Sequence, residues 1–224
     1  MKKVLVPFLF FVLCVMLSFT NQTEKTIRYL PLGDSYTICT GASPKESWPH
    51  LLTNHLNETK FNCILLDNPA RNGFTTQDLI DNELPLLKTL KPDFVTLLIG
   101  VNDWVRNVPV ATFDRNLVYI LDEIQKSIPD KSKIILITIP DFGVTPTGKN
   151  YSNGRNISNG IAEFNTIIKL EAKKRKLPVV DIFELTKKMG SDESLVARDG
   201  LHPSAKEYAL WETLVLPEAV KLLK

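Results

Sequence analysis

Short, nearly continuous apolar runs alternate along the chain with longer stretches in which apolar residues recur every three or four positions. The short runs predict strands at 27–32, 62–67, 93–99, 133–139 and 178–182. The longer stretches predict helices at 46–57, 75–90, 111–127, 158–175 and 203–223. The last three strands are apolar almost throughout, which indicates burial on both faces and is typical of a parallel sheet.

Strand and helix units that follow one another in this way predict an α/β fold of three layers. Right-handed crossovers place the helices on both faces of one parallel sheet. In such folds the ligand crevice lies outside the carboxyl ends of the strands. Residues that directly follow a strand are therefore the first candidates for chemistry.

The first twenty residues stand apart from this pattern. Two lysines precede an almost wholly apolar run, Val4 to Leu17, and small residues follow it, which is the layout of a secretory signal peptide. The run is shorter than the ~20 residues of a membrane-spanning helix. Cleavage is thus favoured over an uncleaved membrane anchor, and a lipid-modified Cys14 is a third alternative. We expect an exported protein, periplasmic or secreted, with one domain over residues 21–224 and no membrane span in the mature chain.

Charge and cysteine content narrow the function classes. Removal of residues 1–20 takes away two lysines, so 27 − 2 = 25 basic side chains face 25 acidic ones. A net charge of zero gives no electrostatic footprint for nucleic acid, and the basic run 173–176 is expected to end a helix.

Cys39 follows the first predicted strand and Cys63 begins the second. If the two strands pair in parallel, the two cysteines lie at opposite edges of the sheet. We therefore expect two free thiols despite an oxidising compartment.

Ser35 is the first candidate for chemistry, because Gly33-Asp34-Ser35 lies on the turn that ends the first predicted strand. A hydroxyl there can act as a nucleophile if a base takes its proton and donors hold the oxyanion. Asp199 and His202, three residues apart near the end of the chain, offer a base and a carboxylate to orient it. Gly73 follows the second strand and Asn102 the third. Each signal is weak alone, and their common edge of the sheet is the evidence.

Together these residues carry a resemblance to a known family. The blocks Gly33-Asp34-Ser35-Tyr36, Gly73, Gly100-x-Asn102-Asp103 and Asp199-x-x-His202-Pro203 resemble, in order and spacing, those of the SGNH (GDSL-type) hydrolase superfamily. The chain is most similar to the small bacterial esterases of the thioesterase I/lysophospholipase L1 group. The resemblance implies a flavodoxin-like fold with a five-stranded parallel sheet of order 2-1-3-4-5. It also implies ester hydrolysis without a metal or another cofactor.

The resemblance gives each matching residue a role. Ser35 is the expected nucleophile, His202 its base, and Asp199 the group that orients the imidazole. The oxyanion hole is expected to consist of the Ser35 and Gly73 backbone N–H groups and the Asn102 side-chain amide. Asp34 is expected to brace the loop without touching substrate.

Three functions remain open on the sequence. The first is a secreted serine esterase, similar to lysophospholipases and acyl esterases, that hydrolyses the carboxylic ester or thioester bond of a small acyl substrate. The second is a carbohydrate O-acetylesterase on the same fold, and the third is a binding module without catalysis. His50 and His55 are five residues apart on a helix, so we expect no metal site there. The oligomeric state stays open.

The segment 141–159 is the least regular part of the chain. It is long for a connection between a strand and a helix, and such loops are often functional. It follows the fourth predicted strand at the edge that carries Ser35. We therefore expect a lid or the wall of an acyl pocket, with Phe142, Val144 and Tyr151 selecting the substrate. A surface loop without function is the alternative.

Overall fold

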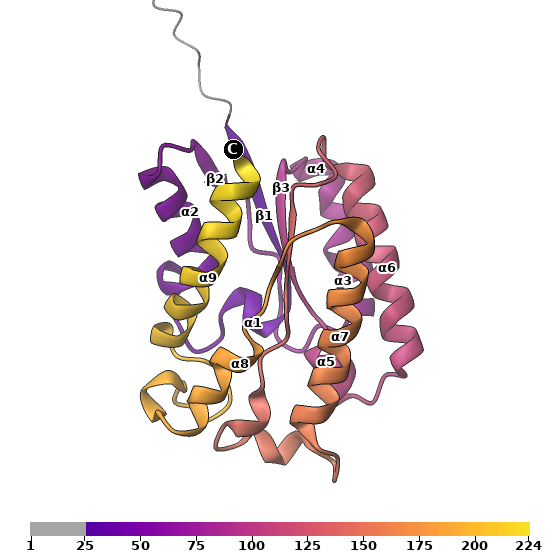
Figure 1. Ribbon diagram of the computed structural model, residues 1–224, viewed down its shortest axis with the longest axis vertical. Coiled ribbons are helices and arrows are strands. Elements are labelled where there is room, and N and C mark those ends of the chain that lie inside the picture. Colours follow the sequence, from indigo (N-terminus) through magenta and orange to yellow (C-terminus); the bar gives the residue numbers. More distant parts are fainter. Residues whose placement is uncertain (1–25) are drawn as a thin grey trace, which may run out of the picture.

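All the predicted apolar runs within the described residues form strands of one parallel sheet (Figure 1). The computed structural model describes residues 26–224, and the expected signal segment 1–20, with Cys14, lies outside them. The strands are β1 (Ile27–Gly33), β2 (Cys63–Leu65), β3 (Phe94–Leu98), β4 (Ile134–Ile137) and β5 (Val179–Val180). Their order, β2-β1-β3-β4-β5, confirms the expected flavodoxin-like arrangement.

Long helices cover both faces of the sheet (Figure 1). One face carries α2 (Trp48–Glu58) and α9 (Ala205–Leu223), which pack against each other. The other carries α3 (Thr76–Asn82), α6 (Val110–Ser127) and α7 (Ile157–Arg175). The short helices are α1 (Ser35–Ile38), α4 (Leu87–Leu90), α5 (Val101–Val105) and α8 (Phe183–Thr186). Three of them, α1, α5 and α8, lie toward the carboxyl ends of the strands, where the site was expected.

The helix predicted over 75–90 is interrupted. It divides into α3, a 3-10 turn at Leu84–Leu86, and α4. Pro85 stands in that turn, and because it lacks a backbone N–H it disfavours a continuous helix. The break has a consequence for the site, since Glu83 at the end of α3 accepts a hydrogen bond from the Gly33 N–H at 3.0 Å.

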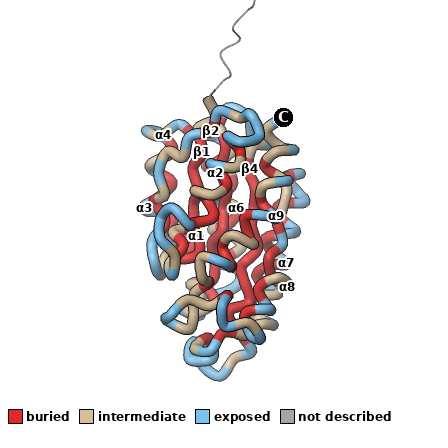
Figure 2. Tube along the Cα trace, turned by 90° about the vertical axis from the view of Figure 1, so that its left-hand side faces the viewer, coloured by how far each residue is buried: buried red, intermediate tan, exposed pale blue. Residues whose placement is uncertain are grey.

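The core follows the sheet, which runs through the buried centre of Figure 2. Every residue of β3 and β4 is buried. Phe113 of α6 stacks on Phe164 of α7, with the ring centroids 4.3 Å apart, and joins the two helices over this face. A fully buried aromatic ring of this kind contributes about 1.5–3 kcal/mol relative to an exposed one.

Both described cysteines are free, as predicted. Cys39 and Cys63 are buried at 1% and 3% exposure. Burial raises the pKa of the Cys39 thiol well above its ordinary value and raises that of Cys63 to about 12. Both thiols therefore stay protonated and pack as apolar side chains.

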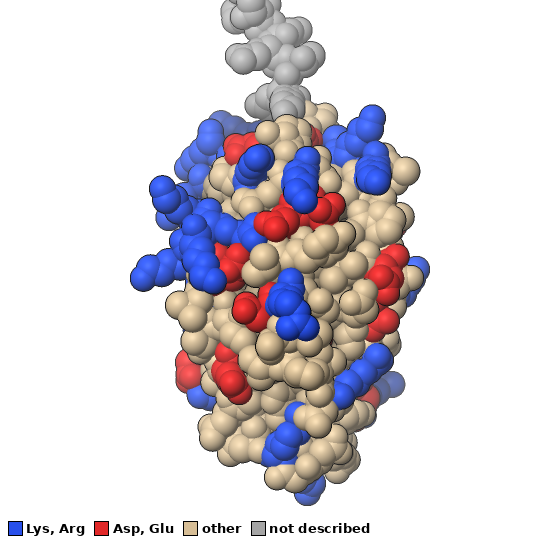
Figure 3. All heavy atoms as spheres, turned by 90° about the vertical axis from the view of Figure 1, so that its right-hand side faces the viewer, with Lys and Arg blue, Asp and Glu red and all other residues tan. Residues whose placement is uncertain are grey.

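The basic run 173–176 ends α7, as expected. Arg175 donates hydrogen bonds to Glu171 on its own helix and to Asp122 on α6, both at 2.7 Å. On the face shown in Figure 3, Lys and Arg side chains gather toward the end where the described chain begins. No helix within residues 26–224 is both long enough and apolar enough to cross a membrane.

Candidate active site

Asp199 and His202 form a tightly held pair in the loop before α9. The Asp199 Oδ2 lies 2.6 Å from the His202 Nδ1, while Oδ1 accepts the N–H groups of Leu201 and His202, both at 2.9 Å. Partial burial raises the pKa of Asp199, but these hydrogen bonds outweigh it and keep that pKa below its ordinary value. A charged carboxylate requires the proton on Nδ1, which leaves Nε2 of the ring as an acceptor.

Ser35 begins α1 directly after β1 and is 6% exposed. The Asp34 Oδ1 accepts the Tyr36 N–H at 3.0 Å and so caps this short helix. The ring of Tyr36 meets the ring of His202 edge-on, with the centroids 5.8 Å apart. The residue after Ser35 therefore contacts the histidine, which places the turn of Ser35 beside the loop of His202.

A glycine lets the two distant segments approach each other. Gly41 follows α1 with φ of +100°, and a Cβ there would lie 2.6 Å from the Ala197 Cβ and 2.7 Å from the Pro203 carbonyl oxygen. Tyr208 of α9 adds a hydrogen bond to the Thr40 carbonyl at 3.0 Å. Residues 35–41 and 197–203 are thus packed together although the chain separates them widely.

Gly73 and Asn102 lie close together, because Asn102 binds the residue that follows Gly73. Gly73 has φ of +81°, a conformation that favours glycine. The Asn102 Nδ2 donates to the Phe74 carbonyl at 2.9 Å, and the amide keeps a second N–H for another acceptor. Asp103, next to Asn102, accepts the Thr76 N–H at 2.8 Å and is 1% exposed. The turn that carries Gly73 is therefore bound to α5.

Two buried carboxyl groups adjoin the turn of Ser35: Asp34 precedes Ser35, and Glu83 binds the Gly33 N–H. Asp34 and Glu83 are both 0% exposed, and the Asp34 Oδ2 has no hydrogen-bond partner among the described residues. Burial raises the pKa of Asp34 to about 8; the Tyr36 N–H lowers it in part, and the charge of Asp103 raises it further. Burial also raises the pKa of Glu83 well above its ordinary value. Asp34 is thus mainly protonated at neutral pH.

The segment 141–159 differs from the expected open loop. It forms 3-10 turns at Phe142–Val144 and Gly148–Tyr151, and α7 begins within it. The prediction that Phe142 lines the crevice is wrong, because its side chain is 2% exposed and packs edge-on against Trp104. Its apolar character in a polar segment indicated a contact with substrate, whereas Phe142 anchors the segment in the core. Val144 is half-buried and Tyr151 is 41% exposed, so substrate selection by these two stays a prediction.

The same segment supports the histidine loop. The Thr147 N–H donates to the Gly200 carbonyl at 2.9 Å, and its hydroxyl donates to the Asp199 carbonyl at 3.4 Å. These bonds, the Tyr36 ring contact and the Arg106 contact with Gly73, at 2.7 Å, were not predicted from the sequence. Arg106 alone had a usable signal, since it follows Asn102 by four residues and so shares its side of a helix.

A cavity of about 380 Å³ adjoins the nucleophile loop. It is lined by apolar and polar side chains in similar number: Ile38, Cys39, Thr40, Ala42, Pro44, Ser47, His50, Leu65, Asn68 and Asn72. The Thr40 hydroxyl donates a hydrogen bond to the side-chain Oδ1 of Asn72 at 2.5 Å. Thr40 follows Ser35 closely in the chain and Asn72 directly precedes Gly73, so the cavity borders the two turns that carry Ser35 and Gly73, although none of the predicted catalytic residues lines it.

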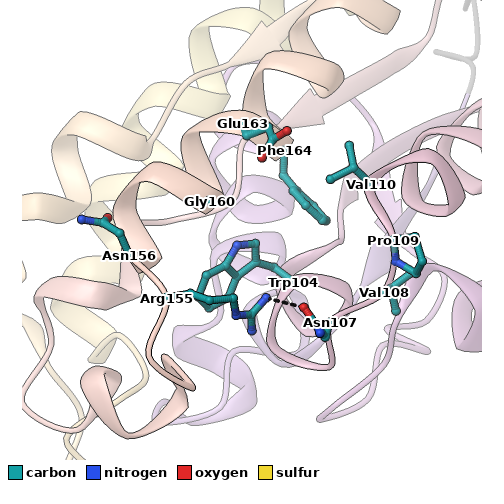
Figure 4. A pocket seen from close by; sticks show the side chains of 10 residues that line it. All are labelled: Trp104, Asn107, Val108, Pro109, Val110, Arg155, Asn156, Gly160, Glu163 and Phe164. Carbon is teal, nitrogen blue, oxygen red and sulfur yellow. Dashed lines mark hydrogen bonds between the residues drawn. The ribbon is translucent and has the colours of Figure 1, made fainter.

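A second cavity, of about 320 Å³, lies between α7 and the connection from α5 to α6 (Figure 4). Its lining residues include Trp104, Arg155 and Gly160. The Arg155 guanidinium lies 3.9 Å from the centroid of the Trp104 ring and donates to the Asn107 side chain at 3.1 Å. As with the first cavity, none of the predicted catalytic residues lines it, and because it adjoins α5 and not the nucleophile loop, we do not assign the reaction to it.

Among the histidines, His55 has a structural partner. Its Nδ1 lies 3.0 Å from the Oε1 of Glu212, which is buried at 2% exposure on α9. This contact joins α2 to α9 on the face of the sheet that they cover together. His55 therefore has a packing role that its position on a predicted helix did not show.

A family model matches most of the chain. The GDSL-like Lipase/Acylhydrolase family matches residues 32–210, which include every residue predicted for the site.

Similar proteins with known names are esterases. A multidomain esterase of Ruminococcus flavefaciens is 33% identical over 122 residues, which cover 54% of this chain but only 15% of that larger protein. Esterase TesA of Pseudomonas aeruginosa is 23% identical over 194 residues, 85% of this chain and 87% of its own. The solved structure of Axe2, an acetylxylan esterase from Geobacillus stearothermophilus, superposes with a TM-score of 0.68. It is 20% identical and covers 85% of this chain and 93% of its own, a likeness of fold.

Proposed function

Because the chain belongs to the GDSL-like lipase/acylhydrolase family and is an ester hydrolase of that family, we propose that it cleaves small acyl oxyesters or thioesters through a serine mechanism. The family that the sequence blocks resembled is thereby confirmed. The proposal assigns Ser35 as nucleophile, His202 as base and Asp199 as the group that orients His202. The observation that carries it is the 2.6 Å contact between Asp199 and His202 beside the nucleophile turn.

The first half of the reaction forms an acyl-enzyme. The Ser35 Oγ attacks the acyl carbon, and its proton moves to the His202 Nε2 while the carbonyl oxygen becomes an oxyanion. The tetrahedral intermediate collapses, the bond to the leaving oxygen or sulfur breaks, and the leaving group takes the proton from Nε2. The Asp199 carboxylate stabilises the imidazolium that exists between the two transfers.

The second half returns the enzyme to its starting state. A water molecule gives a proton to the His202 Nε2 and attacks the acyl carbon, and the second tetrahedral intermediate releases the acid as the proton returns to the Ser35 Oγ. In both halves the oxyanion accepts hydrogen bonds from the Ser35 N–H, the Gly73 N–H and the free N–H of the Asn102 amide. Loss of one such donor typically costs about 10²–10³ in turnover.

Turnover of p-nitrophenyl acetate and butyrate by the wild-type chain, Ser35→Ala and His202→Ala tests this assignment. We expect both substitutions to remove measurable turnover while the melting temperature stays close to that of the wild type. Unchanged turnover in Ser35→Ala would refute the serine mechanism.

A carbohydrate O-acetylesterase is the second candidate function. Thr40, Ser47, His50, Asn68 and Asn72 give the cavity beside the nucleophile loop a polar side, which suits a sugar. Its apolar side suits an acyl chain. We favour the acyl esterase because the Thr40 and Asn72 side chains bind each other, so this part of the polar side is already occupied and offers less to a sugar. A series of p-nitrophenyl esters from C2 to C12, measured beside acetylated xylan, separates the two. Turnover that peaks at acetyl and is faster on the xylan would select the second function.

We also propose that residues 1–20 direct export and are then removed. The support is the sequence of this segment, two lysines followed by an apolar run and small residues. Expression of the full chain in a bacterium, followed by N-terminal sequencing of the product, tests the proposal. A product in the periplasm or medium that begins near residue 21 is expected; a product that keeps Met1 and stays with the membrane would select the anchor instead.

A further inference from the structure

The turn that carries Gly73 is bound to α5 at several points, and one of them has no role in the mechanism above. Asn102 donates to the Phe74 carbonyl, and Asp103 accepts from Thr76. Arg106, directly after α5, reaches the remaining carbonyl of the turn: its Nη2 donates to the Gly73 oxygen at 2.7 Å. A charge-assisted bond of this length is among the stronger hydrogen bonds in proteins.

Gly73 requires such a restraint more than other positions do. Its φ of +81° lies in the region that glycine enters freely, and without a Cβ the neighbouring peptide planes rotate at low cost. Its neighbours are each held by one side-chain hydrogen bond, Asn72 by Thr40 and Phe74 by Asn102, and Arg106 alone binds Gly73 itself among the described residues. A donor displaced by about 1 Å from its productive position can cost about 10² in rate.

We propose that Arg106 is a positioning residue of the oxyanion hole: it holds the Gly73 carbonyl, restricts the rotation of the peptide groups on both sides of Gly73, and so keeps the Gly73 N–H directed at the developing oxyanion. The inference rests on the proposed function, since it assumes that the Gly73 N–H serves the reaction. Arg106 does not touch the substrate in this account. It acts through Gly73, as Asp199 acts through His202.

The shape of the guanidinium suits this task. Its Nη2 binds the Gly73 oxygen while its Nη1 lies 3.5 Å from the Asp78 Oδ2. Asp78 in turn accepts the Thr75 N–H at 2.9 Å and the Thr75 hydroxyl at 2.8 Å. One planar group therefore joins the glycine to the first turn of α3. A lysine, a compact charge on a flexible stem, lacks this fork.

The exposure of Arg106 argues against a purely structural role. Its side chain is 56% exposed and that of Asp78 is 38% exposed. Ion pairs at such sites contribute little to the free energy of unfolding. Removal of Arg106 is therefore expected to change the reaction far more than the fold.

The experiment compares Arg106→Ala and Arg106→Lys with the wild type. It measures kcat and KM on p-nitrophenyl butyrate, and the inhibition constant of a simple alkylboronic acid, which forms a tetrahedral adduct with a serine nucleophile. We expect kcat of Arg106→Ala to fall by about 10–10² with KM within about twofold, and boronate affinity to weaken by a similar factor. Arg106→Lys is expected to lie between the two. Millimolar guanidinium ion is expected to restore part of the turnover of Arg106→Ala.

Arg155→Ala is the matched control. Arg155 also binds the end of α5, since it donates to the Val105 carbonyl at 3.3 Å, but it lies over Trp104 and makes no hydrogen bond to Gly73 within the described part of the chain. We expect this variant to lower the melting temperature and to keep the wild-type kcat and boronate affinity. Guanidinium is expected to have no effect on its turnover.

Two outcomes separate this inference from the function on which it rests. If Ser35→Ala is inactive while folded Arg106→Ala keeps the wild-type kcat or boronate affinity, the positioning role is wrong and the serine mechanism stands. If Ser35→Ala keeps its turnover, the proposed function fails first. Should Arg106→Ala not fold, wild-type kinetics in folded Arg106→Lys and Arg106→Gln would equally overturn the inference.

Discussion

Asp199 shows how a single side chain can fix the histidine that we propose as the base. One carboxylate oxygen holds the His202 ring, and the other holds the backbone of the same histidine. The ring and its peptide are thus fixed together relative to one acid, and Gly200, with φ of +73°, allows the tight turn between them. The orientation of the imidazole depends on this carboxylate more than on any other contact in the loop.

Asp199→Asn tests that dependence. If the amide oxygen stays with the N–H groups of Leu201 and His202, the amide N–H faces the His202 Nδ1. If the amide is turned round, its oxygen faces Nδ1 and the two backbone N–H groups lose their acceptor. The ring then loses the tautomer that leaves Nε2 free, and we expect kcat to fall by about 10³–10⁴ with little change in melting temperature. Steady-state kinetics on p-nitrophenyl butyrate measure it, and a loss below about tenfold would contradict the role of Asp199.

Asp34 makes a prediction about pH and stability. Its pKa rises from near 3.8 in the unfolded chain to about 8 in the fold, so between these values the folded protein holds a proton that the unfolded chain has lost. This contribution is complete below about pH 4 and is lost as the pH rises toward 8. Asp34→Asn cannot titrate and keeps an oxygen for the Tyr36 N–H.

We therefore expect the stability of Asp34→Asn relative to the wild type to improve between pH 5 and 8, by at most about 1.4 kcal/mol per pH unit, and to level off above that range. Urea unfolding at several pH values measures the difference. A difference that stays constant from pH 5 to 9 would show that Asp34 is ionised in the fold.

At the scale of elements, α5 and α7 position the site from behind. Trp104 of α5 lies against α7, and Gly160 makes room for it, since a Cβ at that position would lie 1.8 Å from the Trp104 Nε1. The helix that carries Asn102 is thereby fixed against a long helix of the outer layer.

Gly160→Ala tests this packing. Within an exposed helix the change would stabilise by up to about 1 kcal/mol. Here we expect a loss of about 1–3 kcal/mol, because the added methyl group overpacks the contact with Trp104. The control is the same change in a Trp104→Phe background, where the smaller ring leaves room and the loss is expected to shrink. Stabilisation by Gly160→Ala alone, in urea unfolding, would contradict the contact.

The elements also show which parts of the fold were predictable. Strands β3 and β4 were predicted because their apolar runs are short and contain β-branched residues, which is typical of strands buried on both faces. The break near Pro85 was missed because the apolar period continues through it. Phe142 was placed wrongly because exposure in an irregular segment depends on packing with Trp104, which is distant in the chain.

At the scale of the molecule, strand order brings the two ends of the described chain together. The residues after β1 and the loop before α9 meet through Gly41 and the Tyr36 ring. This contact could be predicted from the sequence because the carboxyl ends of parallel strands lie at one edge of the sheet. The same reasoning predicted that Gly73 and Asn102 follow strands at that edge. The spacing of Arg106 from Asn102 could have indicated its place near the site, but the bonds that Arg106 and Thr147 make to backbone carbonyls could not be predicted, because a backbone carbonyl is present at every residue.

The central claim is that Ser35 is a nucleophile activated by His202, and covalent labelling tests it most directly. The wild-type chain is treated with an alkyl fluorophosphonate, and the modified peptide is identified by mass spectrometry. We expect one label per chain, on Ser35, with labelling slowed at least about 10³-fold in His202→Ala and absent in Ser35→Ala. A label on another residue, or equal labelling of Ser35 without His202, would contradict the account.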